Sequence, residues 1–139
     1  MSYPVLLHTA IDARDCRGLA EFYRELLGLH YRQGEEAPIG GGHDDADWIV
    51  LLDDNGSRVV TVQEKKDSTP PTWPSEDVPM QMHMDFKLPT VEDLERHRER
   101  AQDLGARLLT TAHRTRVNPS MSLPIRLAIR SACWSSRTR

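Results

Sequence analysis

A chain of 139 residues and 15.8 kDa has the length of one globular domain and can bury a core. Hydrophobic residues make up 38% of it, and no apolar run approaches the roughly 20 residues that span a bilayer. The first residues show no basic leader, so we expect a cytoplasmic protein without a membrane partner. Two cysteines, Cys16 and Cys133, are too few for a disulfide framework.

The net charge of −3 is distributed unevenly. Residues 1–103 hold all 21 acids and 11 of the 18 Lys+Arg and sum to −10, whereas residues 104–139 hold seven arginines and no acid and sum to +7. A basic tail is one way to bind nucleic acid. This tail lacks lysine, and its arginines are not interleaved with aromatic residues, so we expect no nucleic-acid partner.

The first half predicts a strand, a helix and two more strands. Residues 4–11 are apolar and β-compatible, and Asp15 then stands where a helix N-cap belongs. Apolar residues recur at helical spacing as far as Leu27, and Gly28 ends the helix. A short strand is predicted near residues 30–32 and a loop over residues 33–47. Residues 48–52 and 58–64 predict two strands joined by a tight hairpin.

The second half repeats the opening pattern after a proline-rich linker, residues 67–79. Residues 80–88 alternate as in a strand, and Thr90 then caps a helix. Leu104 and Gly105 end this helix, as Leu27 and Gly28 end the first one. His8 precedes Asp15 by seven residues, and His83 precedes Thr90 by seven. An offset of 75 residues therefore superposes both halves, which predicts a duplicated module.

The chain resembles the vicinal oxygen chelate superfamily over about residues 3–109. The resemblance rests on two segments, HTAIDARDCRGLAEFYRELLGL and HMDFKLPTVEDLERHRERAQDLGARLL. That superfamily includes glyoxalases, bleomycin-resistance proteins and extradiol dioxygenases, and the resemblance is nearest to bacterial glyoxalase-like domains. It implies an α+β fold in a single domain, residues 1–139, built of two βαβββ modules. Module one is residues 1–66, the linker 67–79 and module two 80–139. Their curved mixed sheet would surround a central cleft.

The resemblance also implies where a divalent metal (Fe, Mn, Ni or Zn) would be held. His8 and His83 match the first-strand positions of the two modules, and Gln63 matches the last-strand position of module one. Glu64 points to the opposite face, and the last strand of module two offers no acid. Trp48 belongs either to the core or to the wall of the cleft. Because two imidazoles and an amide are a weak ligand set, we favour a cleft without metal.

The function we favour is small-molecule binding of unassigned specificity, with ligand contacts from His8, Gln63, His83 and Trp48 and with a homodimer as an expected assembly. The alternative is a metal-dependent lyase, isomerase or dioxygenase acting on a substrate with vicinal oxygens. A third hypothesis is a damaged copy without activity.

The tail supports that third hypothesis. The residues after about 110 can be back-translated with GC-rich codons and read in another frame. One such translation contains the acids, the turn and the apolar closing strand that the resemblance leads us to expect. We therefore predict a one-base insertion or two-base deletion near Thr110, either in the gene or in its recorded sequence. The encoding DNA checks this, since codons incompatible with the alternative translation would contradict it. Alternating apolar residues at 123–129 still predict one edge strand, which Pro124 keeps from the sheet interior.

Overall fold

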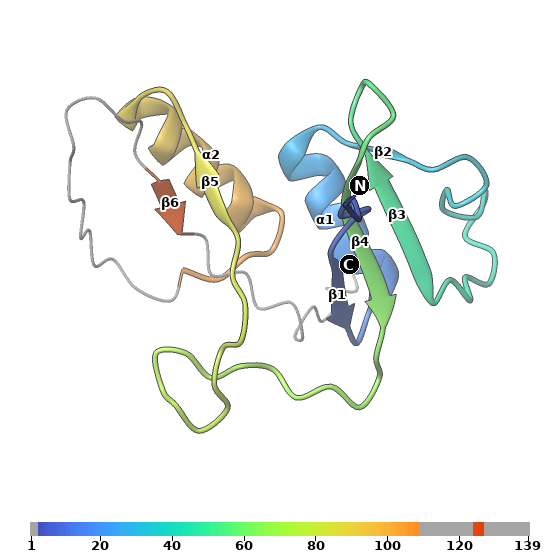
Figure 1. Ribbon diagram of the computed structural model, residues 1–139, viewed down its shortest axis with the longest axis horizontal. Helices are drawn as coiled ribbons and strands as arrows, with labels where there is room; N and C mark the ends of the chain where they lie inside the picture. The colour runs from blue at the N-terminus through green and yellow to red at the C-terminus, as the bar shows by residue number, and fades with distance from the viewer. Residues whose placement is uncertain (1–2, 109–123, 127–139) are drawn as a thin grey trace. The chain divides into compact units, whose positions relative to one another are not determined.

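The computed structural model describes residues 3–108 and 124–126 (Figure 1). These residues form two compact units, one ending at Thr69 and the other beginning at Pro70. The described residues of module one lie in the first unit and those of module two in the second. The elements are β1 (Ala10–Ala13), α1 (Cys16–Leu27), β2 (His30–Tyr31), β3 (Trp48–Leu52), β4 (Arg58–Glu64), β5 (Asp85–Lys87), α2 (Val91–Asp103) and β6 (Pro124–Arg126).

Helix α1 begins and ends where the sequence predicts. The Asp15 carboxylate accepts a hydrogen bond from the Gly18 N–H at 2.8 Å, which satisfies one of the free donors of the first turn. At the other end Gly28 adopts φ +67°, a conformation that glycine reaches without a steric cost. The apolar face of α1 is buried and consists of Leu19, Ala20, Phe22, Tyr23 and Leu26.

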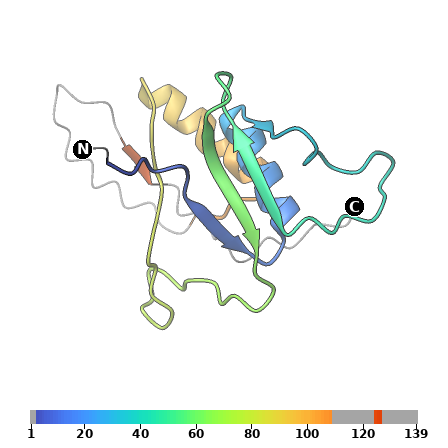
Figure 2. The same cartoon turned by 45° about the vertical axis from the view of Figure 1, so that its right-hand side comes forward.

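The strands of module one form one mixed sheet in the order β1-β4-β3-β2. β1 runs parallel to β4, whereas β4, β3 and β2 are successive antiparallel neighbours. Figure 2 shows α1, in blue, behind the green strands β3 and β4 of this sheet. The predicted α+β class and the βαβββ order of module one are confirmed.

The core of module one lies between α1 and one face of this sheet. The Cys16 thiol donates a hydrogen bond to the Val62 carbonyl at 3.4 Å, which joins the helix to the central strand. Strand side chains of the same face are at most 3% exposed, namely Ile49, Leu51, Val60 and Val62. Because side chains alternate along a strand, the opposite face carries the residues between them, Trp48, Val50, Thr61 and Gln63.

The first strand is shorter than the predicted span of residues 4–11. β1 begins at Ala10, which aligns with Thr61, and residues 3–9 lie outside the regular strand. The ladder between β3 and β4 is irregular at Val59, two residues before that first β1 partner. A bulged edge gives an incoming strand no straight partner, so regular pairing starts beyond the bulge.

Module two contains fewer strands than module one in the described residues. Strand β5 pairs with β6 in antiparallel register, from Asp85 opposite Arg126 to Lys87 opposite Pro124. The predicted span of residues 80–88 was therefore too long, since β5 extends only as far as β6 pairs with it. The Thr90 hydroxyl accepts from the Asp93 N–H at 3.0 Å and caps α2 as predicted.

The internal repeat is visible in the element boundaries. The strands β1 and β5 start 75 residues apart, and so do the helices α1 and α2 with their caps Asp15 and Thr90. A duplicated strand and helix are therefore confirmed.

The predicted change near Thr110 lies outside the described residues. Strand β6 falls within the alternating segment 123–129 and confirms a strand over the first part of that span.

Candidate ligand-binding site

The predicted site residue His8 lies two residues before β1 and is half-buried. Its ring meets the Trp48 ring edge to face, with centroids 5.7 Å apart and planes at 65°. Its Nδ1 lies 3.3 Å from a guanidinium nitrogen of Arg58. The structure therefore brings together two of the predicted site residues, His8 and Trp48, and adds Arg58 to them.

The guanidinium determines the hydrogen-bonding role of the His8 ring. Arginine has only donors, so Nδ1 of His8 accepts, and a neutral imidazole then carries its proton on Nε2. The ring in this arrangement offers a donor rather than a lone pair. A divalent cation needs a lone pair and is repelled by a neighbouring guanidinium, so the observed His8 geometry does not suit a metal ligand.

Arg58 reaches His8 because β4 contains an extra residue. Leu51 is opposite Val60, but Leu52 is opposite Arg58, so Val59 has no partner in the ladder. Such a bulge reverses the alternation of side chains. Arg58 consequently shares the face of Thr61 instead of the helix-covered face of Val60. The sequence analysis did not identify Arg58, although the adjacent valines at 59 and 60 interrupt the alternation and are a signal of it.

Thr61 lies in the middle of the same face. Its side chain is fully buried, and within the described chain its Oγ1 has no hydrogen-bond partner. A buried hydroxyl without a partner is unfavourable, and a hydrogen bond to a ligand atom or a water would stabilise it. We call His8, Trp48, Arg58 and Thr61 the His8 cluster.

The predicted residue Gln63 occupies the other end of that face. It is exposed and stands opposite Trp48 on β3 and Asp12 on β1. The next residue, Glu64, is half-buried and pairs with Lys66 at 3.2 Å. Gln63 is therefore a neighbour of Trp48 in the sheet, and its role as a ligand-binding or metal-binding residue stays a prediction.

His83 belongs to module two and, like His8, lies two residues before its strand. Its Nε2 is 3.6 Å from an Asp85 carboxylate oxygen, and both side chains are at least 40% exposed. A cleft shared by His8 and His83 stays a prediction. Within residues 3–108, no three His, Cys, Asp or Glu side chains gather as a metal-binding group.

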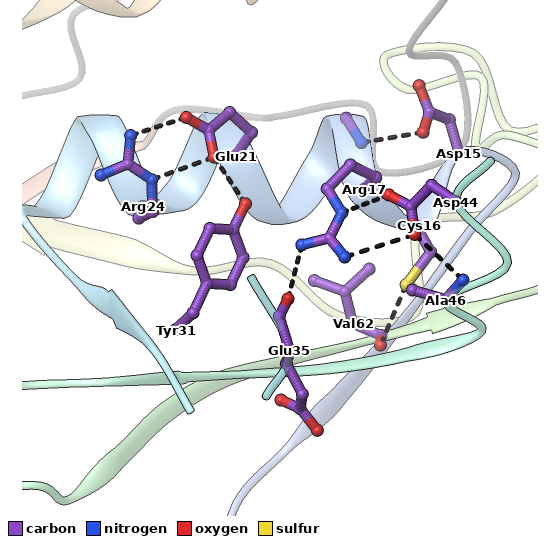
Figure 3. A network of polar contacts seen from close by, with 11 residues as sticks. Asp15, Cys16, Arg17, Glu21, Arg24, Tyr31, Glu35, Asp44, Ala46 and Val62 are labelled. Carbon is purple, nitrogen blue, oxygen red and sulfur yellow. Dashed lines mark hydrogen bonds and ion pairs between the residues drawn. The ribbon is translucent and has the colours of Figure 1, made fainter. Parts of the chain in front are cut away.

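A second polar network ties the loop of residues 33–47 to α1 (Figure 3). Arg17 pairs with Asp44 at 2.6 Å and donates to the Glu35 carbonyl at 2.7 Å. The Glu35 carboxylate accepts from the Val50 N–H at 2.7 Å. Through these contacts the loop is fixed against the helix and against β3.

The same helix carries an acid-sensitive ion pair. Hydrogen bonds from Arg24 lower the pKa of Glu21, although partial burial opposes them, and the Tyr31 hydroxyl also donates to this carboxylate. The stabilisation is therefore complete above the ordinary pKa of 4.5 and is lost as the pH falls through the lowered value. We expect Glu21→Gln to reduce the acid sensitivity of unfolding, measured as urea midpoints between neutral and acidic pH.

The exposed Glu99 provides the matched control. Glu99→Gln should leave the pH dependence of the urea midpoint unchanged. Equal slopes in the parent and in Glu21→Gln would contradict the role assigned to this ion pair.

Neither of the described helices has the length and apolar character that a membrane crossing requires. Among protein families, the model of the glyoxalase-like domain matches residues 8–124. A search of curated proteins gave no match.

Three solved structures are similar to the chain. The first, described as a possible glyoxalase from Bacillus cereus, is 18% identical, with a TM-score of 0.49 over 73% of this chain and 74% of that one. An integron cassette protein from the mobile metagenome of Halifax Harbour sewage outfall is 20% identical, with a TM-score of 0.43 over 74% and 72%. A glyoxalase/dioxygenase from Nostoc punctiforme is 18% identical, with a TM-score of 0.41 over 75% of each chain.

Proposed function

Because the chain belongs to the family of glyoxalase-like domains, we propose that it binds a small organic molecule on the sheet face that carries the His8 cluster. Family membership alone leaves the chemistry open, since one fold hosts many activities. The proposal therefore depends on the residues of this face.

The contact between Arg58 and His8 is the observation that carries the proposal. It places two donor groups on the sheet face that also carries the indole of Trp48, which packs against His8, and the buried Thr61 hydroxyl, which lacks a partner. A few convergent polar groups next to an apolar surface are typical of small-molecule sites. The alternative, a metal-dependent lyase, isomerase or dioxygenase, would require His8 to leave Arg58 and offer a lone pair to the metal.

Ligand screening and metal analysis of the full-length protein test the proposal together. We expect the purified protein to be free of stoichiometric metal and to be stabilised by some members of a small-molecule library. A ligand present at 100 times its Kd raises the free energy of unfolding by about 2.7 kcal/mol, which a thermal-shift measurement detects. Trp48→Ala should reduce that shift, because it removes the indole from the site.

His30 provides a matched control for the metal measurement, because it is an exposed histidine paired with Asp54 outside the His8 cluster. Stoichiometric Fe, Mn, Ni or Zn that is lost in His8→Ala but kept in His30→Ala would support the metal-dependent alternative. A library without any stabilising compound would contradict small-molecule binding.

A further inference from the structure

We infer that the ligand of the His8 cluster carries a carboxylate, which Arg58 and His8 bind, joined to an aromatic or other flat apolar body that lies against Trp48. This inference rests on the proposed function and names the chemical class of its ligand. It requires an available positive charge, a second donor group in contact with it, and an apolar surface next to that group.

The charge of Arg58 is available for a ligand. Its guanidinium contacts the His8 imidazole and no acidic side chain of the described residues. Other arginines in this part of the chain are ion-paired with acids, namely Arg17, Arg24, Arg32, Arg96 and Arg98. A half-buried guanidinium without a counterion attracts an anion, and its planar fork suits the two oxygens of a carboxylate.

Asp12, an acid on the same sheet face, lies too far along it to neutralise Arg58. The hairpin acids closer to Arg58 have other partners, since Asp53 accepts from the Asn55 and Ser57 N–H groups and Asp54 pairs with His30. Asp12 aligns with Gln63, which is five residues from Arg58 along β4. At about 3.3 Å per residue the separation is about 16 Å, which exceeds the Debye length of about 8 Å at physiological salt. An anion beside Arg58 is therefore attracted more strongly by the guanidinium than it is repelled by Asp12.

His8 links the aromatic and the cationic members of the cluster. His8 contacts Trp48 at the start of β3 and Arg58 at the start of β4, which are opposite ends of the antiparallel pair. Between those ends stand Val50 and Thr61, opposite each other and fully buried. With Nδ1 used by Arg58, the imidazole presents Nε2–H, and the unpartnered Thr61 hydroxyl is a further donor on this face.

Trp48 supplies the apolar surface. Its indole is half-buried and already packs against the His8 ring, so one aromatic wall adjoins the donor groups. A flat ring on the ligand would continue this packing, whereas its carboxylate would reach Arg58. This combination distinguishes an aromatic carboxylate from a bare inorganic anion.

Paired probes of the same size and shape, one a carboxylate and the other its neutral amide, test the inference: benzoate against benzamide, and phenylacetate against phenylacetamide. Binding to the full-length protein is followed by tryptophan fluorescence and by calorimetry. We expect each carboxylate to bind at least about tenfold more tightly than its amide. Arg58→Gln should remove that preference, and Arg58→Lys should restore part of it because the charge returns. Arg14→Gln is the control, since Arg14 donates to the Ser68 carbonyl outside the cluster.

Each outcome decides between the inference and the broader proposal. Equal affinity for acid and amide, or an unchanged preference in a folded Arg58→Gln variant, overturns the carboxylate inference and leaves small-molecule binding intact. If Arg58→Gln fails to fold, the acid-to-amide ratio of the parent protein and of Arg58→Lys decides. Saturable Zn²⁺ binding that His8→Ala abolishes overturns the inference in favour of a metal site. A lack of binding by these probes and by the whole library overturns both proposals.

Discussion

Leu19→Ala is expected to lower the free energy of unfolding by about 2–5 kcal/mol. Leu19 is fully buried on the apolar face of α1, where the helix packs on the sheet of module one. The substitution removes buried apolar surface and leaves a cavity that a packed interface fills only in part. Because a domain of this size is stabilised by only about 5–15 kcal/mol, the loss is a large part of the total. Urea unfolding followed by circular dichroism measures it.

A matched leucine on the surface separates this effect from the general cost of a shorter side chain. Leu6 is 81% exposed, so Leu6→Ala should change the unfolding free energy by less than about 0.5 kcal/mol. If Leu19→Ala cost no more than Leu6→Ala, the packing of α1 on the sheet would be refuted.

The Cys16 thiol is expected to react about 1,000-fold more slowly with iodoacetamide in the folded protein than in urea near pH 8. Burial raises its pKa to about 12, and the nearby Glu64 carboxylate adds to the shift. Only the thiolate reacts. Raising the thiol pKa from 9.0 to about 12 lowers the thiolate fraction near pH 8 about 1,000-fold. The unfolded state ionises first, so this thiol should also make the protein less stable as the pH rises above about 9.

A variant with a single reactive position makes the measurement specific. In a Cys133→Ser background, peptide mass spectrometry follows Cys16 alone. Ser57→Cys, at an exposed position of the β3–β4 hairpin, supplies a thiol that should react at the rate of a free cysteine. Similar labelling rates at positions 16 and 57 would show that Cys16 is accessible and would contradict its buried assignment.

The local structure could be predicted from the residues themselves, because caps, turns and apolar periodicity act over a few residues. Asp15 and Gly28 delimit α1, and Thr90 begins α2, as their side-chain and backbone preferences require. The 75-residue repeat and the resemblance to glyoxalase-like domains also came from the sequence, and the match over residues 8–124 confirmed that family. Whether His8 and His83 meet is a long-range question that such local preferences leave open.

The residues that surround His8 depend on the pairing of the strands and could not be predicted from local patterns. Strict alternation along β4 would place Arg58 with Val60 and Val62 on the face that α1 covers. The extra residue at Val59 reverses that assignment and brings the guanidinium to the imidazole. The burial of Thr61 without a hydrogen-bond partner likewise depends on neighbours distant in sequence. A bulge forms only when two strands pair. The residues of one strand therefore predict its alternating pattern, but they do not predict on which face of the sheet a residue beyond the bulge lies.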